Sequence, residues 1–539
     1  MAQESHADVV IVGAGVAGAL IGWKLATAGV KVLILESGPW VNRGTALQTF
    51  WAAEAKTPES PYPPVAYAPR PDTTNLKNYY VQEGPDLFSS TYERRVGGTT
   101  WHWLGTALRL VPNDFRERSQ YRISVDWPIS YDDLEPWYTE AEKVLGVSGD
   151  SQQSLGSPRR GPYPLPPIPQ TYLDKQWTAA AAKVGLRVQS TPQARNSKPY
   201  DGRPACCGSS NCIPLCPIGA KYDGAVHAMK AQKAGAQILD QAVVHLIEIG
   251  PDRRVAAVSF KRPDGSVHRV TGKVFVIAAH AIETPKLLLM SRSTAWPNGA
   301  ANSSDQVGRN LMDHPTQLSW ALAKNPVYPY RGPLATSGIE QLRDGSFRRE
   351  RAAFRIEIGN DGWSWPVADP TGEVPERVKQ GLRGQALIAK LNEHVSREVR
   401  LASLMEQQPD PENRVTPAFD EVDAIGIPRP RIRYRLDTFT LRGLAEARKV
   451  HDQLFDALGV TYRQHWKGFQ GAGHVMGTYR MGANAKTSVV DAECRTHDHR
   501  NLFLLGSGVF PTVGTANPTL SIAALALRAV EPVRKTLAQ

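Results

Sequence analysis

The chain is poor in several features, each of which would define a class of protein. It has only five cysteines in 539 residues, too few for a disulfide scaffold. No apolar run approaches the ~20 residues that a membrane-spanning helix needs. The first residues, Met1 to Asp8, contain neither a basic nor an apolar segment, so the sequence predicts no signal peptide. Taken alone, these features indicate a cytoplasmic globular protein.

A concentrated basic patch is also missing, although the net charge is +11. Arginine pairs at 159–160, 253–254 and 348–349 are scattered along the chain, without the stacking aromatic residues typical of nucleic-acid binding. We therefore expect no nucleic-acid partner. The charge predicts either a solvated basic surface or attraction to an acidic partner, an anionic substrate or a membrane surface.

Four of the five cysteines are concentrated in residues 206–217, with the sequence CCGSSNCIPLCP. Structural zinc usually has two separated cysteine pairs, and no second pair exists here. Bacterial iron–sulfur runs often end in Cys-Pro, as this one does. Adjacent residues of an extended chain point to opposite sides, which leaves Cys206, Cys212 and Cys216 as the expected ligands. The spacing favours an iron–sulfur site, while disulfides and zinc remain open alternatives.

The N-terminal residues predict a β-α-β unit that binds a dinucleotide. Its parts are a buried strand at 9–12, the turn glycines Gly13, Gly15 and Gly18, a helix at about 17–28, and a strand at 32–35 that ends in Glu36. Glycines let the backbone approach a pyrophosphate at a helix N-terminus, and the acidic residue can bind a ribose hydroxyl. Together with the cysteines, this unit suggests a dehydrogenase in which electrons arrive in pairs and leave singly.

Five further stretches carry a family resemblance. They are RVGGTTWHW at 95–103, AAHAIETPKLL at 278–288, VGRNLMDHP at 307–315, HVMGT at 474–478 and GTANPT at 514–519. In this order they resemble the glucose–methanol–choline (GMC) oxidoreductases, and the similarity runs from Val9 to Leu527. The resemblance implies FAD rather than NAD at the first glycine turn.

The resemblance also implies an α/β fold, in which an α+β substrate-binding domain is inserted into a Rossmann-like FAD-binding domain. We expect residues 1–125, 195–315 and 466–539 to form the FAD-binding domain with its iron–sulfur segment at 206–217, residues 126–194 to form a connecting excursion, and residues 316–465 to form the substrate-binding domain.

The segment from Gln193 to Cys207 narrows the resemblance within the family. It is similar to the large flavoprotein subunits of bacterial membrane-bound sugar and sugar-acid dehydrogenases. These relatives imply a [3Fe-4S] cluster, a small subunit that carries the export signal and a multihaem cytochrome c subunit. They also imply work at the periplasmic face of the inner membrane, as part of a complex, without a signal peptide or transmembrane segment in this chain.

Two residues are expected to act on the substrate hydroxyl. Oxidation of an alcohol needs a base for the hydroxyl proton, and a histidine is suited to that task. The family pattern places a catalytic histidine at His474 and a histidine or asparagine at Asn517. We expect His474 to take the proton and Asn517 to orient the hydroxyl.

A second flavin-contacting turn is implied at Gly97, Gly98, Thr99 and Thr100. The following His102 resembles a histidine of pyranose oxidases that bonds covalently to FAD, so either a covalent link or simple packing beside the flavin is expected. The Asp-His-Pro turn at 313–315 resembles a structural element near the flavin.

The substrate is the least determined part of the prediction. Glucose or gluconate is favoured among sugars, polyols and aldonates, and the basic charge slightly favours an aldonate. Specificity is expected to reside in residues 316–465. Two alternatives remain, an oxidase that reduces oxygen directly and a non-catalytic flavin redox protein.

Overall fold

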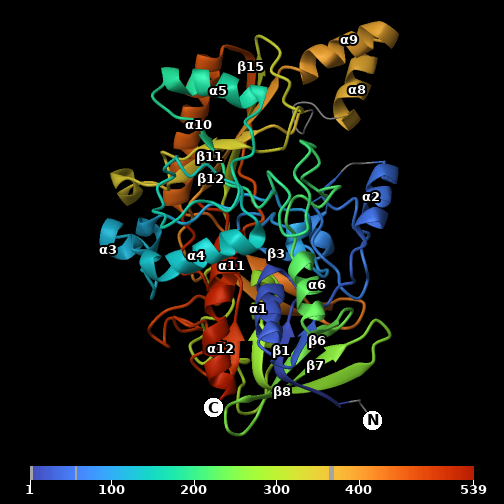
Figure 1. Ribbon diagram of the computed structural model, residues 1–539, viewed down its shortest axis with the longest axis vertical. Helices are drawn as coiled ribbons and strands as arrows, with labels where there is room; N and C mark the ends of the chain where they lie inside the picture. Colours follow the sequence, from blue (N-terminus) through green and yellow to red (C-terminus); the bar gives the residue numbers. More distant parts are fainter. Residues whose placement is uncertain (1–3, 55–56, 74, 363–369) are drawn as a thin grey trace.

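The structure, a computed structural model, describes residues 4–539 except 55–56, 74 and 363–369. Its described strands form a seven-stranded, a six-stranded and a three-stranded sheet. The seven-stranded sheet lies in the lower half of the view in Figure 1, and strands of the six-stranded sheet lie in the upper half. Among the helices of the described residues, none combines the length and apolar character needed to cross a membrane.

The seven-stranded sheet has the order β5-β2-β1-β8-β7-β6, with β16 also paired to β8. Its strands are β1 (Glu4–Val12), β2 (Val32–Leu35), β5 (Gln237–Leu239), β6 (Val243–Ile249), β7 (Val255–Lys261), β8 (Val267–Ile277) and β16 (Leu502–Leu504). Pairing is parallel among β5, β2, β1, β8 and β16, and antiparallel across β8, β7 and β6. The predicted strand at 9–12 begins earlier, at Glu4, because its first half also pairs with β8.

Helices cover the parallel part of this sheet. The helix α1 (Val16–Thr27) follows β1 directly and packs beside α6 (Ala225–Lys233) and α11 (Thr519–Arg528). All three helices lie together over the sheet in Figure 1, with α12 (Val530–Leu537) below α11. The predicted β-α-β unit is therefore present, and its helix starts one residue before the predicted one.

The six-stranded sheet has the order β15-β9-β12-β11-β10-β4 and is antiparallel. Its strands are β4 (Gln189–Ser190), β9 (Thr316–Ala323), β10 (Ser337–Ile339), β11 (Phe354–Gly359), β12 (Glu398–Met405) and β15 (Val460–His465). One face packs against α5 (Tyr172–Lys183) and α10 (Thr438–Leu458), where Ile356 and Leu401 meet Trp177 and Phe455 in one core cluster. Side chains of the other face form a separate cluster that includes Trp320.

The third sheet has the order β13-β14-β3. Its strands are β13 (Arg414–Val422), β14 (Pro428–Arg433) and β3 (Val81–Glu83). The remaining helices are α2 (Arg43–Ala52), α3 (Glu117–Tyr121), α4 (Tyr131–Leu145), α7 (His280–Met290), α8 (Pro370–Lys379) and α9 (Gly384–Val395), with 3-10 turns at Leu76–Asn78, Gly98–Trp101, Pro112–Phe115, Ser346–Arg349 and Ser507–Val509. The domain boundaries given above stay a proposal. Two of the sheets join strands from different proposed parts, since β3 pairs with β14 and β4 with β10.

The sequence predicts a helix from about Thr284 to Ser291, but helix α7 begins four residues earlier, at His280. Pro285 suggests a helix start, because proline is tolerated in the first turn, where its missing N–H is not needed. In the structure Pro285 lies inside the helix, so the carbonyl of Ala281 loses its normal donor. The hydroxyl of Thr478 donates to that carbonyl at 2.6 Å. This distant threonine therefore allows the helix to include its proline.

Candidate active site

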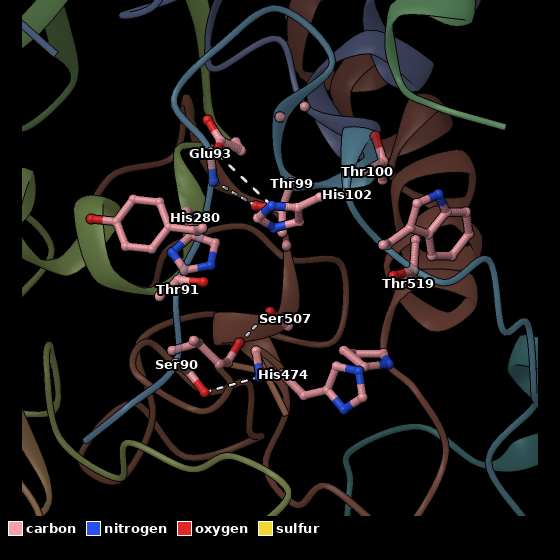
Figure 2. Close-up of a pocket in the computed structure, with 18 of the residues that line it drawn as sticks. Ser90, Thr91, Glu93, Thr99, Thr100, His102, His280, His474, Ser507 and Thr519 are labelled. Carbon is pink, nitrogen blue, oxygen red and sulfur yellow. Dashed lines mark hydrogen bonds and ion pairs between the residues drawn. The ribbon is translucent and has the colours of Figure 1, made fainter. Parts of the chain in front are cut away.

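One cavity of about 600 Å³ is lined both by the glycine turn after β1 and by strands of the six-stranded sheet. The sequence-predicted residues on its lining are Gly13, Gly15, Glu36, Gly98, Thr99, Thr100, His102, His474 and Asn517. Gly18 and Gly97 do not line the cavity. Because they have no side chains, neighbouring backbone segments can pack closely against them. Figure 2 shows part of the cavity, with His102 and His474 at different levels of it.

The first glycine turn opens the N-terminus of α1 toward the cavity. Gly13 has a φ of +100°, and a Cβ at Gly18 would lie 1.9 Å from the carbonyl oxygen of Gly13. Gly15 is the N-cap residue and has no side chain to cover the first N–H groups of the helix. Helix N-termini of this kind favour phosphate groups. Glu36 accepts a hydrogen bond from the backbone N–H of Ala14 at 2.8 Å, which fixes its carboxylate beside the turn.

The second glycine turn touches the first one. Gly97 and Gly98 both have positive φ, at 98° and 59°. The N–H of Gly97 donates to the carbonyl of Ala14 at 2.9 Å, and a Cβ at Gly98 would lie 3.2 Å from the Cα of Gly15. The hydroxyl of Thr100 closes the turn by donating to the carbonyl of Gly97 at 2.5 Å. The turn that the sequence singled out thus lies against the predicted dinucleotide site.

His102 lies on the cavity wall beside a buried carboxyl group. Its Nδ1 is 3.9 Å from Oε1 of Glu93, as the dashed line in Figure 2 shows. Within the described part of the chain, neither of these two atoms has a hydrogen-bond partner. Burial lowers the pKa of His102 to about 3, with Lys221 acting in the same direction. Burial raises the pKa of Glu93 to about 7. At neutral pH the imidazole of His102 is therefore uncharged, with a lone pair available.

His474 stands between two hydrogen-bonding neighbours. Its Nε2 is 3.2 Å from the amide nitrogen of Asn517, and its Nδ1 is 2.9 Å from Nδ1 of His314. The other ring nitrogen of His314 is 3.4 Å from the carbonyl oxygen of Val513. The structure thus brings together the two predicted residues and adds His314, which the sequence assigned to a structural turn.

These contacts determine where the protons lie. Burial lowers the pKa of His314 to about 4 and that of His474 well below its ordinary value, so both rings are neutral. The carbonyl of Val513 can only accept, which places the proton of His314 on Nε2. His314 Nδ1 must then accept from His474 Nδ1. The remaining nitrogen of His474, Nε2, keeps its lone pair, which accepts a hydrogen bond from the amide N–H of Asn517 and can accept a proton from a substrate.

Asp313 positions the backbone that carries His474. Its Oδ1 accepts from the N–H of His474 at 3.0 Å, and its other oxygen accepts from the hydroxyl of Ser90. Burial raises the pKa of this carboxyl group, while the same hydrogen bonds act in the opposite direction. The Asp-His pair at 313–314 therefore supports the candidate base from two sides.

All five cysteines lie in the described residues, and each is a free thiol, which removes the disulfide alternative. Cys206, Cys207, Cys212 and Cys216 line one small cavity. Backbone N–H groups of Gly208 and Lys221 donate to the sulfurs of Cys206 and Cys216 at 3.4 and 3.5 Å. Across the part of the chain that the structure describes, no three Cys, His, Asp or Glu side chains are grouped closely enough to hold a metal ion. The predicted ligands Cys206, Cys212 and Cys216 line the same cavity, but in this structure their side chains are not close enough together to bind one metal ion.

Two cations are buried beside these thiols. Arg195 is 1% exposed and lines the thiol cavity. Its Nε and Nη1 have no hydrogen-bond partner among the described residues. Lys221 donates from Nζ to the carbonyl oxygens of Trp101, Trp103 and Cys212, at 2.9, 2.5 and 2.8 Å. A buried guanidinium with free donors indicates that this cavity favours negative charge.

Comparison with known proteins identifies the family. The GMC oxidoreductase N-terminal family model matches residues 8–316, and the C-terminal model matches residues 409–526. The chain belongs to the GMC oxidoreductases, a family that binds FAD. The predicted fold class, α/β with the GMC arrangement, is confirmed.

The chain is similar over its length to dehydrogenases and, in fold, to an oxidase. It is 40% identical to the fructose dehydrogenase large subunit of Gluconobacter japonicus, covering 99% of this chain and 98% of the relative. It is 29% identical to 2-methyl-1,2-propanediol dehydrogenase of Mycolicibacterium austroafricanum, covering 97% and 94%. A structure of Aspergillus oryzae RIB40 formate oxidase, described for its FAD modification, has a TM-score of 0.68 at 16% identity and covers 98% of both chains. The similarity to a large subunit supports the predicted subclass.

Sequence reasoning missed two residues of the site. His314 contacts His474 across 160 positions of sequence, and Glu93 faces His102 from the segment before the second glycine turn. No local spacing predicts either contact. The Asp-His-Pro turn was a signal for His314, but its packing against the candidate base is a tertiary contact.

Proposed function

We propose that this chain is the flavoprotein subunit of a dehydrogenase that oxidises a hydroxyl-bearing carbon of a sugar, polyol or aldonate. The observation that carries the proposal is the lone pair of His474 Nε2, oriented by His314 within the cavity that also contains both glycine turns. Bound FAD supplies the acceptor for the hydride that leaves the carbon.

The residues of the two glycine turns fit an FAD molecule. The N–H groups at the start of α1 and the close approach allowed by Gly13 and Gly15 suit its pyrophosphate. Glu36 lies at the end of β2, where an acidic residue can bind the adenosine ribose. His102 and His474 both line the cavity that begins at these turns and would contact the ring system of bound FAD.

The substrate hydroxyl is activated by the chain's own side chains. His474 Nε2 accepts the hydroxyl proton, while Nδ1 stays bonded to His314. The amide of Asn517 orients the hydroxyl next to that nitrogen, and its Oδ1 has no partner in the described structure. His474→Ala and Asn517→Ala separate the two roles, as predicted below.

We further propose that His102 bonds covalently to the flavin. In such a link an imidazole nitrogen of His102 would lose its proton and bond to the 8α carbon of the flavin, which would also lose a proton; the electron pair released would reduce the flavin, and the electron acceptor of turnover would reoxidise it. The Nδ1 atom of His102 has no partner among the described residues, and Oε1 of Glu93, 3.9 Å away, is placed to receive the imidazole proton. Acid precipitation tests this proposal. Flavin absorbance should stay with the wild-type pellet and move to the supernatant in His102→Ala. Flavin released fully from the wild type would contradict it.

We propose a [3Fe-4S] cluster at Cys206, Cys212 and Cys216. The free thiols on one cavity, the N–H groups directed at two of the sulfurs and the unpartnered donors of Arg195 support it. Such a cluster, held by these three thiolates, would supply one-electron exit from the site.

Replacing one cysteine separates the two halves of the reaction. Cys212→Ser should keep reduction of the flavin by substrate and lose electron transfer to a cytochrome c acceptor, with Cys494→Ser as the matched control. Iron and sulfide analysis and an electron paramagnetic resonance spectrum measure the cluster directly. Full iron content in Cys212→Ser would contradict the ligand assignment.

The proposed complex contains a small subunit with an export signal and a multihaem cytochrome c subunit, at the periplasmic face of the inner membrane. The similarity to a dehydrogenase large subunit supports a multi-subunit assembly. Expression of this chain alone should leave it in the cytoplasm and poorly coupled to respiration. Its appearance in the periplasm without a partner would overturn the export proposal.

The first experiment is turnover of the purified holoprotein on a panel of fructose, sorbitol, glucose and gluconate with a dye acceptor. We expect flavin bands and turnover with at least one substrate, without matching oxygen consumption. Stoichiometric hydrogen peroxide would instead favour the oxidase alternative. Bound flavin without any turnover would favour a redox protein that is not an enzyme.

A further inference from the structure

One face of the six-stranded sheet lines the cavity and carries polar side chains there. Side chains alternate along a strand, so Leu318 and Trp320 of β9, Glu357 of β11, and Arg400 and Ala402 of β12 all line the cavity. The register places Glu357 opposite Ala402 and Arg400 opposite Trp320. Apolar and charged side chains thus lie next to each other on one face.

Three charged residues form the polar part of this face. Nε of Arg400 is 2.8 Å from Asp361, and its Nη2 is 3.9 Å from Glu357. Gly359 stands opposite Arg400 in the register, and a Cβ there would lie 2.6 Å from both Arg400 Nε and Asp361 Oδ1. The glycine therefore makes the space in which the guanidinium and the carboxylate meet.

The charges around this group are balanced. Arg355 contacts Glu357 at 3.3 Å and Glu340 at 3.1 Å, and Glu340 is 3.7 Å from Arg343. The connected network contains three carboxylates and three guanidinium groups. On the cavity wall itself, however, Arg400 faces two carboxylates, Glu357 and Asp361. Among the described residues, this face of the sheet has no unpaired cation that could bind a further negative charge.

We infer that Glu357, Asp361 and Arg400 bind the substrate hydroxyls remote from the oxidised carbon, and that they select neutral polyhydroxylated substrates over sugar acids. The inference rests on the proposed function and specifies its substrate class. A hydroxyl both donates and accepts, so paired carboxylates and a guanidinium satisfy several of them with charge-assisted hydrogen bonds. A sugar-acid carboxylate would have to displace Asp361 from Arg400. Leu318 and Ala402 face the apolar C–H groups of the same substrate.

The test compares Glu357→Gln and Asp361→Asn with wild type on sorbitol, fructose, glucose and gluconate. Asp420→Asn is the matched control, because Asp420 is an exposed carboxylate paired with Arg431 outside the cavity. In wild type, kcat/KM should be higher for a neutral substrate than for gluconate. Each cavity variant should lower the ratio of neutral to gluconate kcat/KM by roughly tenfold or more, as expected for lost hydrogen bonds to charged groups.

Several outcomes decide between the claims. Flavin content and thermal midpoint establish that each variant is folded, and weak competitive inhibition of wild type by gluconate gives a measurement independent of any variant. Higher wild-type kcat/KM on gluconate, strong inhibition by it, or an unchanged ratio in both folded variants would overturn the inference while leaving the dehydrogenase proposal intact. A flavin-loaded wild type that oxidises none of the four substrates would overturn both.

Discussion

His474 depends on a neighbour that its own sequence motif does not contain. The bond from His474 Nδ1 to His314, and from His314 to the carbonyl of Val513, leaves only one nitrogen of the base facing the cavity. The same histidine without these neighbours would exchange its proton between two positions. At the scale of single residues, the proposed mechanism therefore needs a fixed tautomer of His474 as well as a base.

His474→Ala should lower kcat by about 10²–10⁴-fold, because the hydroxyl proton loses its acceptor. Flavin content should stay at the wild-type level. Asn517→Ala should be milder and act more on KM, because the amide orients the hydroxyl without taking the proton. Stopped-flow reduction of the flavin by substrate measures both. Wild-type reduction rates in His474→Ala would place the base elsewhere.

His314→Phe tests the tautomer. Without the acceptor at Nδ1, His474 can carry its proton on Nε2, so kcat should fall by roughly tenfold or more while flavin and substrate binding persist. His314→Asn offers a side-chain acceptor and should recover part of the rate. Equal losses in both variants would indicate a packing role only.

At the scale of secondary-structure elements, helix α7 depends on a hydrogen bond from a segment far away in the sequence. Helix α7 includes Pro285 because Thr478 donates to the fully buried carbonyl of Ala281. The first turn of this helix begins at His280, which lines the cavity. A hydrogen bond from the strand-like segment after His474 therefore helps to hold a wall of the site.

Thr478→Val should lower the free energy of unfolding by about 1–3 kcal/mol, because it leaves a buried carbonyl without a donor. Thr478→Ser should be much milder. Pro285→Ala restores the backbone N–H that normally pairs with Ala281, so it should rescue Thr478→Val more than it affects wild type. Urea unfolding of the four proteins in a double-mutant cycle measures the coupling. Simple additivity would rule out this compensation.

The sequence predicted the β-α-β unit well because the strand residues at 9–12 and 32–35 are buried and its glycines perform local roles. The sequence also predicts a strand at 431–434; in the structure this strand, β14, begins three residues earlier, at Pro428, because Pro428 and Pro430 obscure its start in the sequence. Within residues 316–465 the sequence named no strand of the six-stranded sheet, although the alternation of Phe354, Ile356 and Ile358 was a readable signal for β11. Contacts such as Arg400 with Asp361 depend on the pairing of β11 with β12, a tertiary contact that local sequence patterns do not reveal.

At the scale of the whole molecule, buried titratable groups set the response to acid. Burial lowers the pKa of nine histidines: His102, His227, His245, His280, His314, His394, His451, His474 and His499. Burial raises the pKa of four carboxyl groups, those of Glu93, Asp114, Glu117 and Asp313. As the pH falls, protonation of the histidines destabilises the folded state, whereas protonation of these carboxyl groups stabilises it. The histidines are more numerous, so their effect is the larger one.

Stability should therefore fall as the pH drops below about 6.5. The unfolded chain then binds histidine protons that the folded chain excludes, so each such histidine costs up to about 1.4 kcal/mol per pH unit. His451, whose pKa is lowered to about 3 by burial, lies outside the cavity lining. His451→Gln should make the free energy of unfolding, measured by urea denaturation, depend less steeply on pH, by the equivalent of about one proton taken up on unfolding. The same change at the exposed His6 should leave the pH dependence as in wild type. A midpoint level from pH 7.5 to 5 would contradict this expectation.

Lys221 has a consequence for how the molecule is assembled. Its ammonium group has three hydrogens, and all three are engaged by carbonyls of two segments, the flavin-side turn and the thiol segment. The ammonium group therefore links the two segments by hydrogen bonds to both. The folded polypeptide thus sets the spacing between the two segments before any cofactor binds, and electron transfer between the proposed flavin and cluster sites would need no rearrangement of the chain.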